Sequence, residues 1–205
     1  MNSIESYIYG LLITDGNLSL STRNRGRVIL EISEKDEDII DKLLTLIPNS
    51  HKRFRTRNTN FKKGYKYVIF VNYRKEFRDK LICEGFPIEN KTINADVPIT
   101  SYDELAFWRG VIDGDGSIGI ASLNYPFVSL TTKSENLKEN YLKFLYKNLG
   151  ITKKIKRNKR DNVYNIMVTR KDAVKLVNIL YENSEIHLNC KYDSAMEVNK
   201  WSNNN

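Results

Sequence analysis

Two aspartates stand in matching positions, and each is followed by glycine: Asp15-Gly16 and Asp115-Gly116. Each pair ends a mostly apolar stretch typical of a buried helix, so each carboxylate is expected at a helix C-terminus. An acid is unfavourable there because the helix dipole is negative at that end, and two neighbouring carboxylates also raise each other's pKa. A divalent cation between them relieves both penalties. Mg²⁺ prefers carboxylate and carbonyl oxygens, so we expect a metal site for phosphodiester chemistry at Asp15, Asp115 and the adjacent backbone of Thr14 and Gly114.

The helices that carry these aspartates share a stripe of small residues. Gly10 and Gly110 each precede their aspartate by five residues, and other small residues recur around them at four-residue spacing. Such a stripe lets two helix backbones approach closely. Close packing would offset the cost of glycine in a helix, roughly 1 kcal/mol against alanine. The shared offset of 100 residues predicts an internal repeat, with two half-sites facing each other about a pseudo-twofold axis.

Hydrophobic periodicity and turn residues predict the same order of elements in both halves: helix, strand, strand, helix, strand, strand, helix. This order makes the chain an α+β protein of two pseudo-symmetric repeats. The first half has expected helices at 4–14, 36–47 and 74–83 and expected strands at 18–20, 28–32, 51–57 and 65–71. The second half has expected helices at 102–113, 134–149, 171–181 and 191–201 and expected strands at 117–122, 127–132, 152–158 and 163–169. The chain is thus divided into a first repeat at 1–85, a linker at 86–101 and a second repeat at 102–205.

The composition favours a polyanionic partner. The 205 residues include 33 Lys and Arg against 25 Asp and Glu, a net charge of +8. Nucleic acid is the first candidate and an anionic membrane surface the second. The sequence offers no amphipathic basic helix and no apolar run of membrane-spanning length, which weakens the membrane alternative. Isolated cysteines and histidines cannot assemble a zinc site, so any metal is expected to bind through oxygen.

Both aspartate segments resemble the nine-residue motif of the LAGLIDADG homing endonucleases. The first copy is Ile8-Tyr-Gly-Leu-Leu-Ile-Thr-Asp-Gly16 and the second is Trp108-Arg-Gly-Val-Ile-Asp-Gly-Asp-Gly116. With two copies, the resemblance covers nearly the whole chain as a single-chain member. It implies a DNA-binding saddle of two four-stranded antiparallel sheets, with the motif helices at the interface. The sixth motif position, often acidic in the family, is Ile13 in one copy and Asp113 in the other.

The resemblance also implies a function. A member of this kind cuts both strands of a long, asymmetric double-stranded DNA target by hydrolysis with two or three Mg²⁺ or Mn²⁺ ions, and leaves short 3′ overhangs. The family's metal-binding acids map to Asp15 and Asp115. The lysine often found near each active site maps to Lys91 and Lys191, each 76 residues after its aspartate. An ammonium group there orders water or offsets charge on the phosphate. A monomer is expected.

Basic and polar residues on the expected strands and turns predict the DNA-binding surface. Arg53, Arg55 and Arg57 alternate along one strand, so their side chains project from one face. Rows of this kind on a concave sheet suit the major groove, where side chains reach bases and phosphates. The second half is neutral at turn positions where the first has arginines, so the two halves are expected to read different half-sites. The expected set is Arg23, Arg25, Arg27, Arg53, Arg55, Arg57, Lys63, Lys66, Ser122, Asn124, Lys154, Lys156, Asn158 and Arg160.

Two alternatives would keep the same fold. One is a maturase that binds its group I intron RNA, and the other is a DNA-binding protein without catalysis. The paired aspartates and lysines favour the nuclease. Glu34 and Thr132 fill a polar position that often orders water in the family, and their roles stay open. No secretion or transit signal is evident, so we expect an intracellular protein encoded in a mitochondrion, chloroplast, bacterium or phage.

Overall fold

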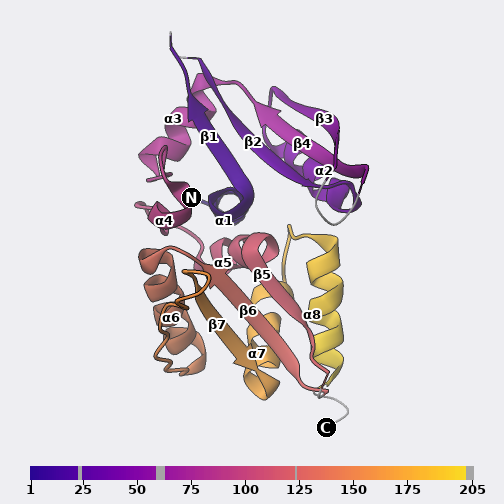
Figure 1. Ribbon diagram of the computed structural model, residues 1–205, viewed down its shortest axis with the longest axis vertical. Helices are drawn as coiled ribbons and strands as arrows, with labels where there is room; N and C mark the ends of the chain where they lie inside the picture. The colour runs from indigo at the N-terminus through magenta and orange to yellow at the C-terminus, as the bar shows by residue number, and fades with distance from the viewer. Residues whose placement is uncertain (23–24, 59–62, 123, 202–205) are drawn as a thin grey trace.

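The computed structural model describes residues 1–22, 25–58, 63–122 and 124–201 of the chain. The first half occupies the upper part of Figure 1 and the second half the lower part, with helices α1 (Ser3–Asp15) and α5 (Glu104–Asp115) between them. Each half combines helices with an antiparallel sheet, so the α+β class is confirmed. Buried side chains from both halves form one continuous hydrophobic core.

In the first half, α1 leads into four antiparallel strands in the order β1-β2-β4-β3. The strands are β1 (Gly16–Leu20), β2 (Gly26–Ser33), β3 (Ser50–Arg57) and β4 (Tyr65–Asn72). The short turn η1 (Glu34–Asp36) leads into α2 (Glu37–Leu46), and α3 (Lys75–Cys83) follows β4. Ile39, Ile40 and Leu43 recur at helical spacing and are buried, and α2 contacts β3 and β4. This packing supports the sheet from the core side.

The second half repeats the order. Its strands are β5 (Gly116–Ile120), β6 (Pro126–Thr132) and β7 (Tyr164–Thr169), and its further helices are α6 (Glu135–Leu149), α7 (Arg170–Tyr181) and α8 (Asn189–Trp201). The first hairpins have equivalent registers, because Gly16 faces Leu30 and Gly116 faces Leu130. Ser134 caps α6 by accepting a hydrogen bond from the N–H of Leu137 at 3.1 Å. The repeat therefore extends to the pairing of strands.

The expected fourth strand of the second sheet, at 152–158, is not formed, so the prediction of two four-stranded sheets is wrong in this half. Among the described residues the second sheet has three strands, in the order β5-β6-β7. Between 152–158 and 163–169, an isolated bridge joins Asn158 and Val163 in place of the expected hairpin pairing. A difference in charge is consistent with this: Arg55 and Arg57 of β3 pair with Glu31 on the same face of the sheet, whereas the equivalent position on β6 is Thr131. A carboxylate on the sheet face favours the addition of a strand rich in basic residues, and the second sheet lacks it at this position.

The connection between the halves contains a one-turn helix, α4 (Lys91–Asn94). It begins at Asn90, whose φ of +48° is a left-handed conformation that asparagine tolerates better than most residues. This turn directs Lys91 toward the end of α1. In the described part of the chain, none of the helices has the length and apolar character needed to cross a membrane.

Candidate active site and nucleic-acid interface

The helices α1 and α5 touch backbone to backbone. A Cβ atom added at Gly10 would lie 2.2 Å from the carbonyl oxygen of Phe107, and one at Gly110 would lie 2.2 Å from that of Tyr7. Both distances are far below van der Waals contact, so a side chain at either position forces the helices apart. The stripe of small residues is the seam between the halves, and it brings the C-terminal ends of α1 and α5 together.

Asp15 and Asp115 end these two helices, and both are exposed at the edge of the seam. A Cβ atom on Gly114 would lie 3.1 Å from Oδ2 of Asp15, so the acid of the first half lies against the motif helix of the second. Loss of solvation near the surrounding protein is the main cause that raises the pKa of Asp15 to about 6, and the charge of Asp115 is the second. Part of the Asp15 side chain is nevertheless open to solvent. Burial likewise raises the pKa of Asp115. Both carboxyls lie in an environment that disfavours their ionised forms.

Lys91 and Lys191 reach the ends of the motif helices from α4 and α8. The Lys91 ammonium donates to the carbonyl oxygens of Ile13, at 3.1 Å, and Thr14. The Lys191 ammonium donates to the carbonyl oxygen of Gly116. Carbonyls at a helix C-terminus carry partial negative charge, so each ammonium neutralises a helix end. Burial lowers the pKa of Lys91 to about 8, while the two aspartates oppose this change.

Thr14 and Gly114 face each other across the seam. A Cβ atom on Gly114 would lie 2.0 Å from Oγ1 of Thr14, whose hydroxyl donates to the carbonyl oxygen of Leu11 at 2.8 Å. Beside them is a cavity of about 210 Å³ with Lys91, Asp115 and Thr132 in its lining. The cavity crosses the boundary between the halves, so the lysine of the first half lies beside the acid of the second.

The oxygen atoms at this site suit a hard divalent cation. Groups of three or more His, Cys, Asp or Glu side chains able to hold a metal are absent from the described residues. Two carboxylates and the carbonyls of the helix ends meet here, and at Thr14 and Gly116 those carbonyls already accept hydrogen bonds from ammonium groups. Oxygen ligands in this number leave positions for water and phosphate, as Mg²⁺ usually requires. The residues therefore fit the expected metal, and it would be held by Asp15, Asp115 and the adjacent backbone carbonyls.

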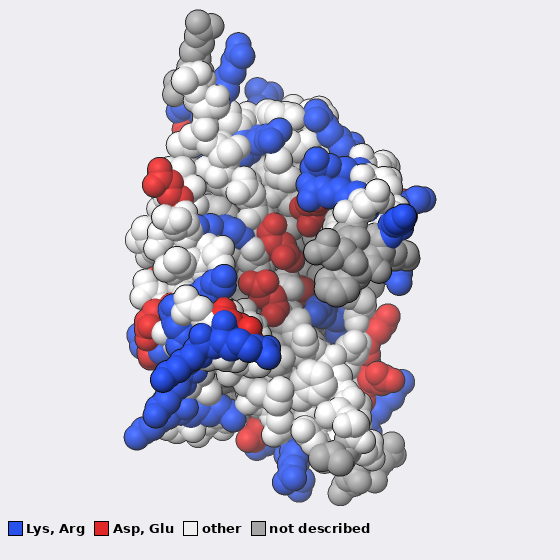
Figure 2. Space-filling view, viewed as in Figure 1, with Lys and Arg blue, Asp and Glu red and all other residues white. Residues whose placement is uncertain are grey.

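A row of arginines lies on the open face of the first sheet. The strand register places Arg27 on the same face as Arg53, Arg55 and Arg57, and all four are exposed. Glu31 lies among them, with a carboxylate oxygen 3.1 Å from Arg57 and another 3.7 Å from Arg55. Figure 2 shows Lys and Arg side chains gathered over the upper and lower halves of this view, with acidic side chains between them. A duplex across this face would meet both basic regions.

The hairpin turns carry further members of the expected set. Arg25, Lys63 and Ser122 are exposed, and Asn124 is exposed with a φ of +54°. The carbonyl oxygen of Asn124 accepts a hydrogen bond from the indole N–H of Trp201 at 3.0 Å, which joins the turn to the end of α8. Arg23 lies outside the described residues. These turns extend the sheets at their edges.

Other members of the set are not on the strand faces where they were expected. Lys66 lies on the side of β4 opposite the arginine row, and its ammonium is 3.6 Å from a Glu34 carboxylate oxygen. Lys154 and Lys156 are exposed on the segment before β7, which is not part of the sheet. Arg160 is paired with the neighbouring aspartate at 2.9 Å. In place of the even row predicted for the second half, the structure has a basic segment that does not join the sheet as a strand.

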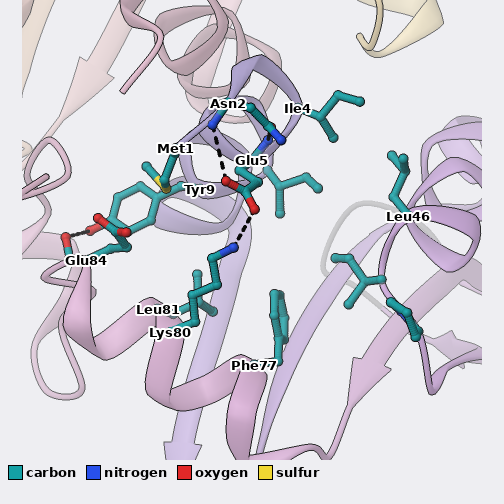
Figure 3. A pocket seen from close by; sticks show the side chains of 13 residues that line it. Met1, Asn2, Ile4, Glu5, Tyr9, Leu46, Phe77, Lys80, Leu81 and Glu84 are labelled. Carbon is teal, nitrogen blue, oxygen red and sulfur yellow. Dashed lines mark hydrogen bonds and ion pairs between the residues drawn. The ribbon is translucent and has the colours of Figure 1, made fainter. Parts of the chain in front are cut away.

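A larger pocket lies at the opposite end of α1 from Asp15 and is shown in Figure 3. Its volume is about 360 Å³, and its lining includes Ile4, Leu46 and Phe77. The ion pair between Glu5 and Lys80 spans one side, so these two charged groups neutralise each other. An apolar pocket of this kind lacks the oxygen ligands of the seam, and it is not the site of the expected chemistry.

The buried acid Asp113 holds three distant parts of the chain together, which its position in the sequence does not indicate. Asp113, the acid at the sixth motif position, is 2% exposed and accepts hydrogen bonds from Tyr7, Tyr181 and Leu188. Its spacing of four residues from Arg109 in an apolar helix is the signal that could have indicated a buried network. The partners themselves come from distant parts of the chain.

Comparisons with known proteins agree with this architecture. A sequence model of the LAGLIDADG-like domain matches residues 103–180. The search of curated protein sequences gives no match. Variants of the homing endonuclease I-DmoI are 18% identical, with 95% of this chain and 97% of that chain covered and a TM-score of 0.58. I-WcaI bound to its DNA recognition sequence is 15% identical, with 96% and 85% covered and a TM-score of 0.64. The N-terminal LAGLIDADG domain of WhiA is 14% identical, with 97% and 86% covered and a TM-score of 0.57.

Proposed function

Because the chain contains a LAGLIDADG-like domain and has the fold of LAGLIDADG homing endonucleases, we propose that it is a site-specific DNA endonuclease that cuts both strands. The observation that carries the proposal is the meeting of Asp15 and Asp115 at the open end of the seam. Each of the two acids lies beside an ammonium group. Two carboxylates at helix C-termini lower the stability of the fold, but they suit metal-dependent phosphodiester chemistry.

Asp15 and Asp115 would hold two or three Mg²⁺ or Mn²⁺ ions together with the carbonyls of Thr14 and Gly114. When bound, such ions activate water and stabilise charge on the leaving oxygen. The chain's own part is to fix the carboxylates. The seam sets their separation, because Gly10 and Gly110 bring the backbones of the two motif helices so close that neither position has room for a Cβ atom. This rigidity suits a reaction that needs its ligands placed accurately.

Lys91 and Lys191 add positive charge at the same two helix ends. We assign them the stabilisation of negative charge on the phosphate during hydrolysis. Asp15 and Asp115 with these lysines are the proposed catalytic groups. The arginine row of the first sheet and the basic segment before β7 would contact the DNA on either side, and their different arrangements favour a target with unlike halves. The chain is proposed to act as a monomer with two repeats, at 1–85 and 102–205.

Selection of cleaved sites from a library of randomised double-stranded DNA tests the proposal. With Mg²⁺ or Mn²⁺, the wild-type protein should select related sequences and cut them on both strands with short 3′ overhangs. Asp15→Asn combined with Asp115→Asn should bind the selected DNA and not cut it. Asp79→Asn is the matched control, because this exposed carboxylate on α3 forms an ion pair with the exposed Lys75 and is not part of the seam. Undiminished cutting by the double variant would refute the assignment of the acids.

A DNA-binding role without cleavage is the second candidate. It is favoured by the equal fold similarity to the WhiA domain and by a basic sheet face that does not require the acids. Sequence-selective binding by the wild-type protein, with no cutting in either metal, would establish this role instead. Preferential binding to structured intron RNA in the same assay would point to a maturase.

A further inference from the structure

A buried arginine on α5 holds the connection between α7 and α8. Arg109 is 5% exposed. Its guanidinium donates to the carbonyl oxygen of Leu180 at 2.8 Å and to that of Ile186 at 2.9 Å. These carbonyls lie at the end of α7 and in the connection that follows. The arginine thus fixes two points of this connection against a motif helix.

Asp113, one helical turn further along α5, holds a third point. Its Oδ2 atom accepts a hydrogen bond from the N–H of Leu188 at 2.7 Å. The carbonyl oxygen of Leu188 in turn accepts from the N–H of Lys191 at 3.1 Å and from that of Tyr192 at 2.9 Å. These two bonds form the first turn of α8. The buried carboxylate is therefore linked through one residue to the turn that carries Lys191.

The remaining oxygen positions of Asp113 are used by two tyrosines. The hydroxyl of Tyr7, on α1, donates to Oδ2 at 2.7 Å, and that of Tyr181, on α7, donates to Oδ1 at 2.6 Å. A buried carboxylate needs such donors to compensate for the loss of water. Because Asp113 is 2% exposed, it can influence the catalytic site only through the residues that it holds.

The first half is built differently. The positions equivalent to Arg109 and Asp113 are Tyr9 and Ile13. The Tyr9 hydroxyl donates to the carbonyl oxygen of Glu84 at 3.3 Å, and an isoleucine side chain has no hydrogen-bonding group. Lys91 is carried on the one-turn helix α4 and contacts the carbonyls of α1 directly. The two lysines therefore have similar positions but different supports.

We propose that Arg109 and Asp113 are positioning residues for Lys191 and act on one half-site only. The inference rests on the proposed endonuclease function, since it assigns Lys191 to one of two strand cleavages. Loss of the Asp113 carboxylate leaves the N–H of Leu188 unpaired and loosens the first turn of α8. Lys91 keeps its own contacts. Cleavage of one strand should slow while the other continues, so nicked DNA should accumulate.

Hydrogen exchange tests the structural link without any need for cleavage. In Asp113→Leu, which removes both acceptor oxygens at similar side-chain volume, amide exchange at Lys191 and Tyr192 should be at least tenfold faster than in the wild-type protein. Exchange in α4 should not change. Equal protection of α8 in both proteins would overturn the proposal. If Asp113→Leu does not fold, Arg109→Lys tests the other anchor of the same connection, because it keeps the charge and loses the planar fork that reaches the carbonyls of Leu180 and Ile186.

Strand-specific cleavage tests the consequence for the reaction. Each strand of the selected target carries its own label, and the two rate constants are measured with Mg²⁺. Asp113→Leu should change their ratio by at least tenfold, with DNA affinity within twofold of the wild-type value. Equal slowing of both strands would overturn the proposal in favour of a general structural role. If the wild-type protein cuts no DNA, the proposed function fails, and the exchange experiment still decides whether the pair holds Lys191.

Tyr181→Phe is the matched control. It removes one hydrogen bond to the same buried carboxylate and leaves the bond between Asp113 and Leu188 in place. It should lower thermal stability without changing the ratio of the strand rates. A strand bias in this variant equal to that of Asp113→Leu would contradict the specific role given to the α8 link.

Discussion

Replacement of Gly110 by alanine measures how far the fold depends on backbone contact at the seam. The added Cβ atom would lie 2.2 Å from the carbonyl oxygen of Tyr7 and 2.8 Å from the backbone nitrogen of Leu11. Ordinary contact begins at 3.4 Å, so α1 and α5 must separate by roughly 1 Å. Overpacking costs about 1–3 kcal/mol and more where backbone must move, whereas alanine gains about 1 kcal/mol of helix propensity. We expect the free energy of unfolding to fall by about 2 kcal/mol or more.

Urea unfolding followed by circular dichroism is the assay. With a slope of about 2–3 kcal/mol per molar urea, the midpoint should fall by about 1 M. Gly119→Ala is the matched control, because its Cβ atom would lie 3.5 Å from the Phe127 ring, an ordinary contact. That variant should stay within about 0.5 kcal/mol of the wild-type protein. If Gly110→Ala unfolds at the wild-type midpoint or above it, the seam does not depend on glycine as argued.

The double variant Gly10→Ala, Gly110→Ala tests the same reasoning in a second way. Each added methyl group meets backbone of the opposite helix, so one separation of the helices relieves both contacts. The second substitution should therefore cost less than the first, with a coupling of about 0.5–3 kcal/mol. Strictly additive losses would show that each contact is relieved locally.

Three further predictions concern charge. Asp15→Asn should stabilise the metal-free protein at pH 8 by about 1 kcal/mol and have little effect at pH 4. The folded pKa of Asp15 is about 6 and the unfolded value is roughly 4, so ionisation destabilises the fold increasingly as the pH rises from about 4 and fully above about 6. Equal gains in stability at both pH values, measured by denaturation, would contradict this. Lys91→Met should tighten Mn²⁺ binding to the free protein several-fold, because its ammonium bonds the carbonyl of Thr14 and repels a cation; calorimetry showing weaker binding would count against it. Glu31→Gln should raise DNA affinity and steepen its salt dependence, because Arg55 and Arg57 lose their carboxylate partner; an unchanged salt slope in an anisotropy titration would show that these arginines do not contact phosphate.

The internal repeat accounts for most of what could be predicted of the fold. Glycine and aspartate at one fixed offset constrain a helix seam and a shared site at the same time. Helix ends were predictable where the residue type is typical of a helix cap. Ser134 caps the start of α6, and Gly150, with a φ of +67°, ends it. The segment before β7 was not predictable in this way. Ile151 and Ile155 are partly buried as in a strand, but pairing depends on charges carried by another strand.

The sequence indicated which residues could come together at the seam but not how they are connected. The spacing of Lys91 and Lys191 indicated two half-sites, and the structure adds that a cavity joins Lys91 to Asp115 of the other half. The network of Asp113 could not be found from the sequence, because its hydrogen-bond donors come from α1, α7 and the start of α8. A single acidic residue in an apolar helix shows only that some partner must exist.

The two lysines explain how the fold accepts two carboxylates at helix C-termini without a cation. Asp15 and Asp115 bring two negative charges, Lys91 and Lys191 bring two positive ones, and the ammonium groups also cover helix-end carbonyls. In this position the ammonium groups could also offset negative charge on a bound phosphate. Lys91 is carried on a one-turn helix, whereas Lys191 lies in the first turn of a long helix anchored through Asp113. The two half-sites should therefore differ in how they respond to metal and DNA, even though their acids occupy equivalent positions.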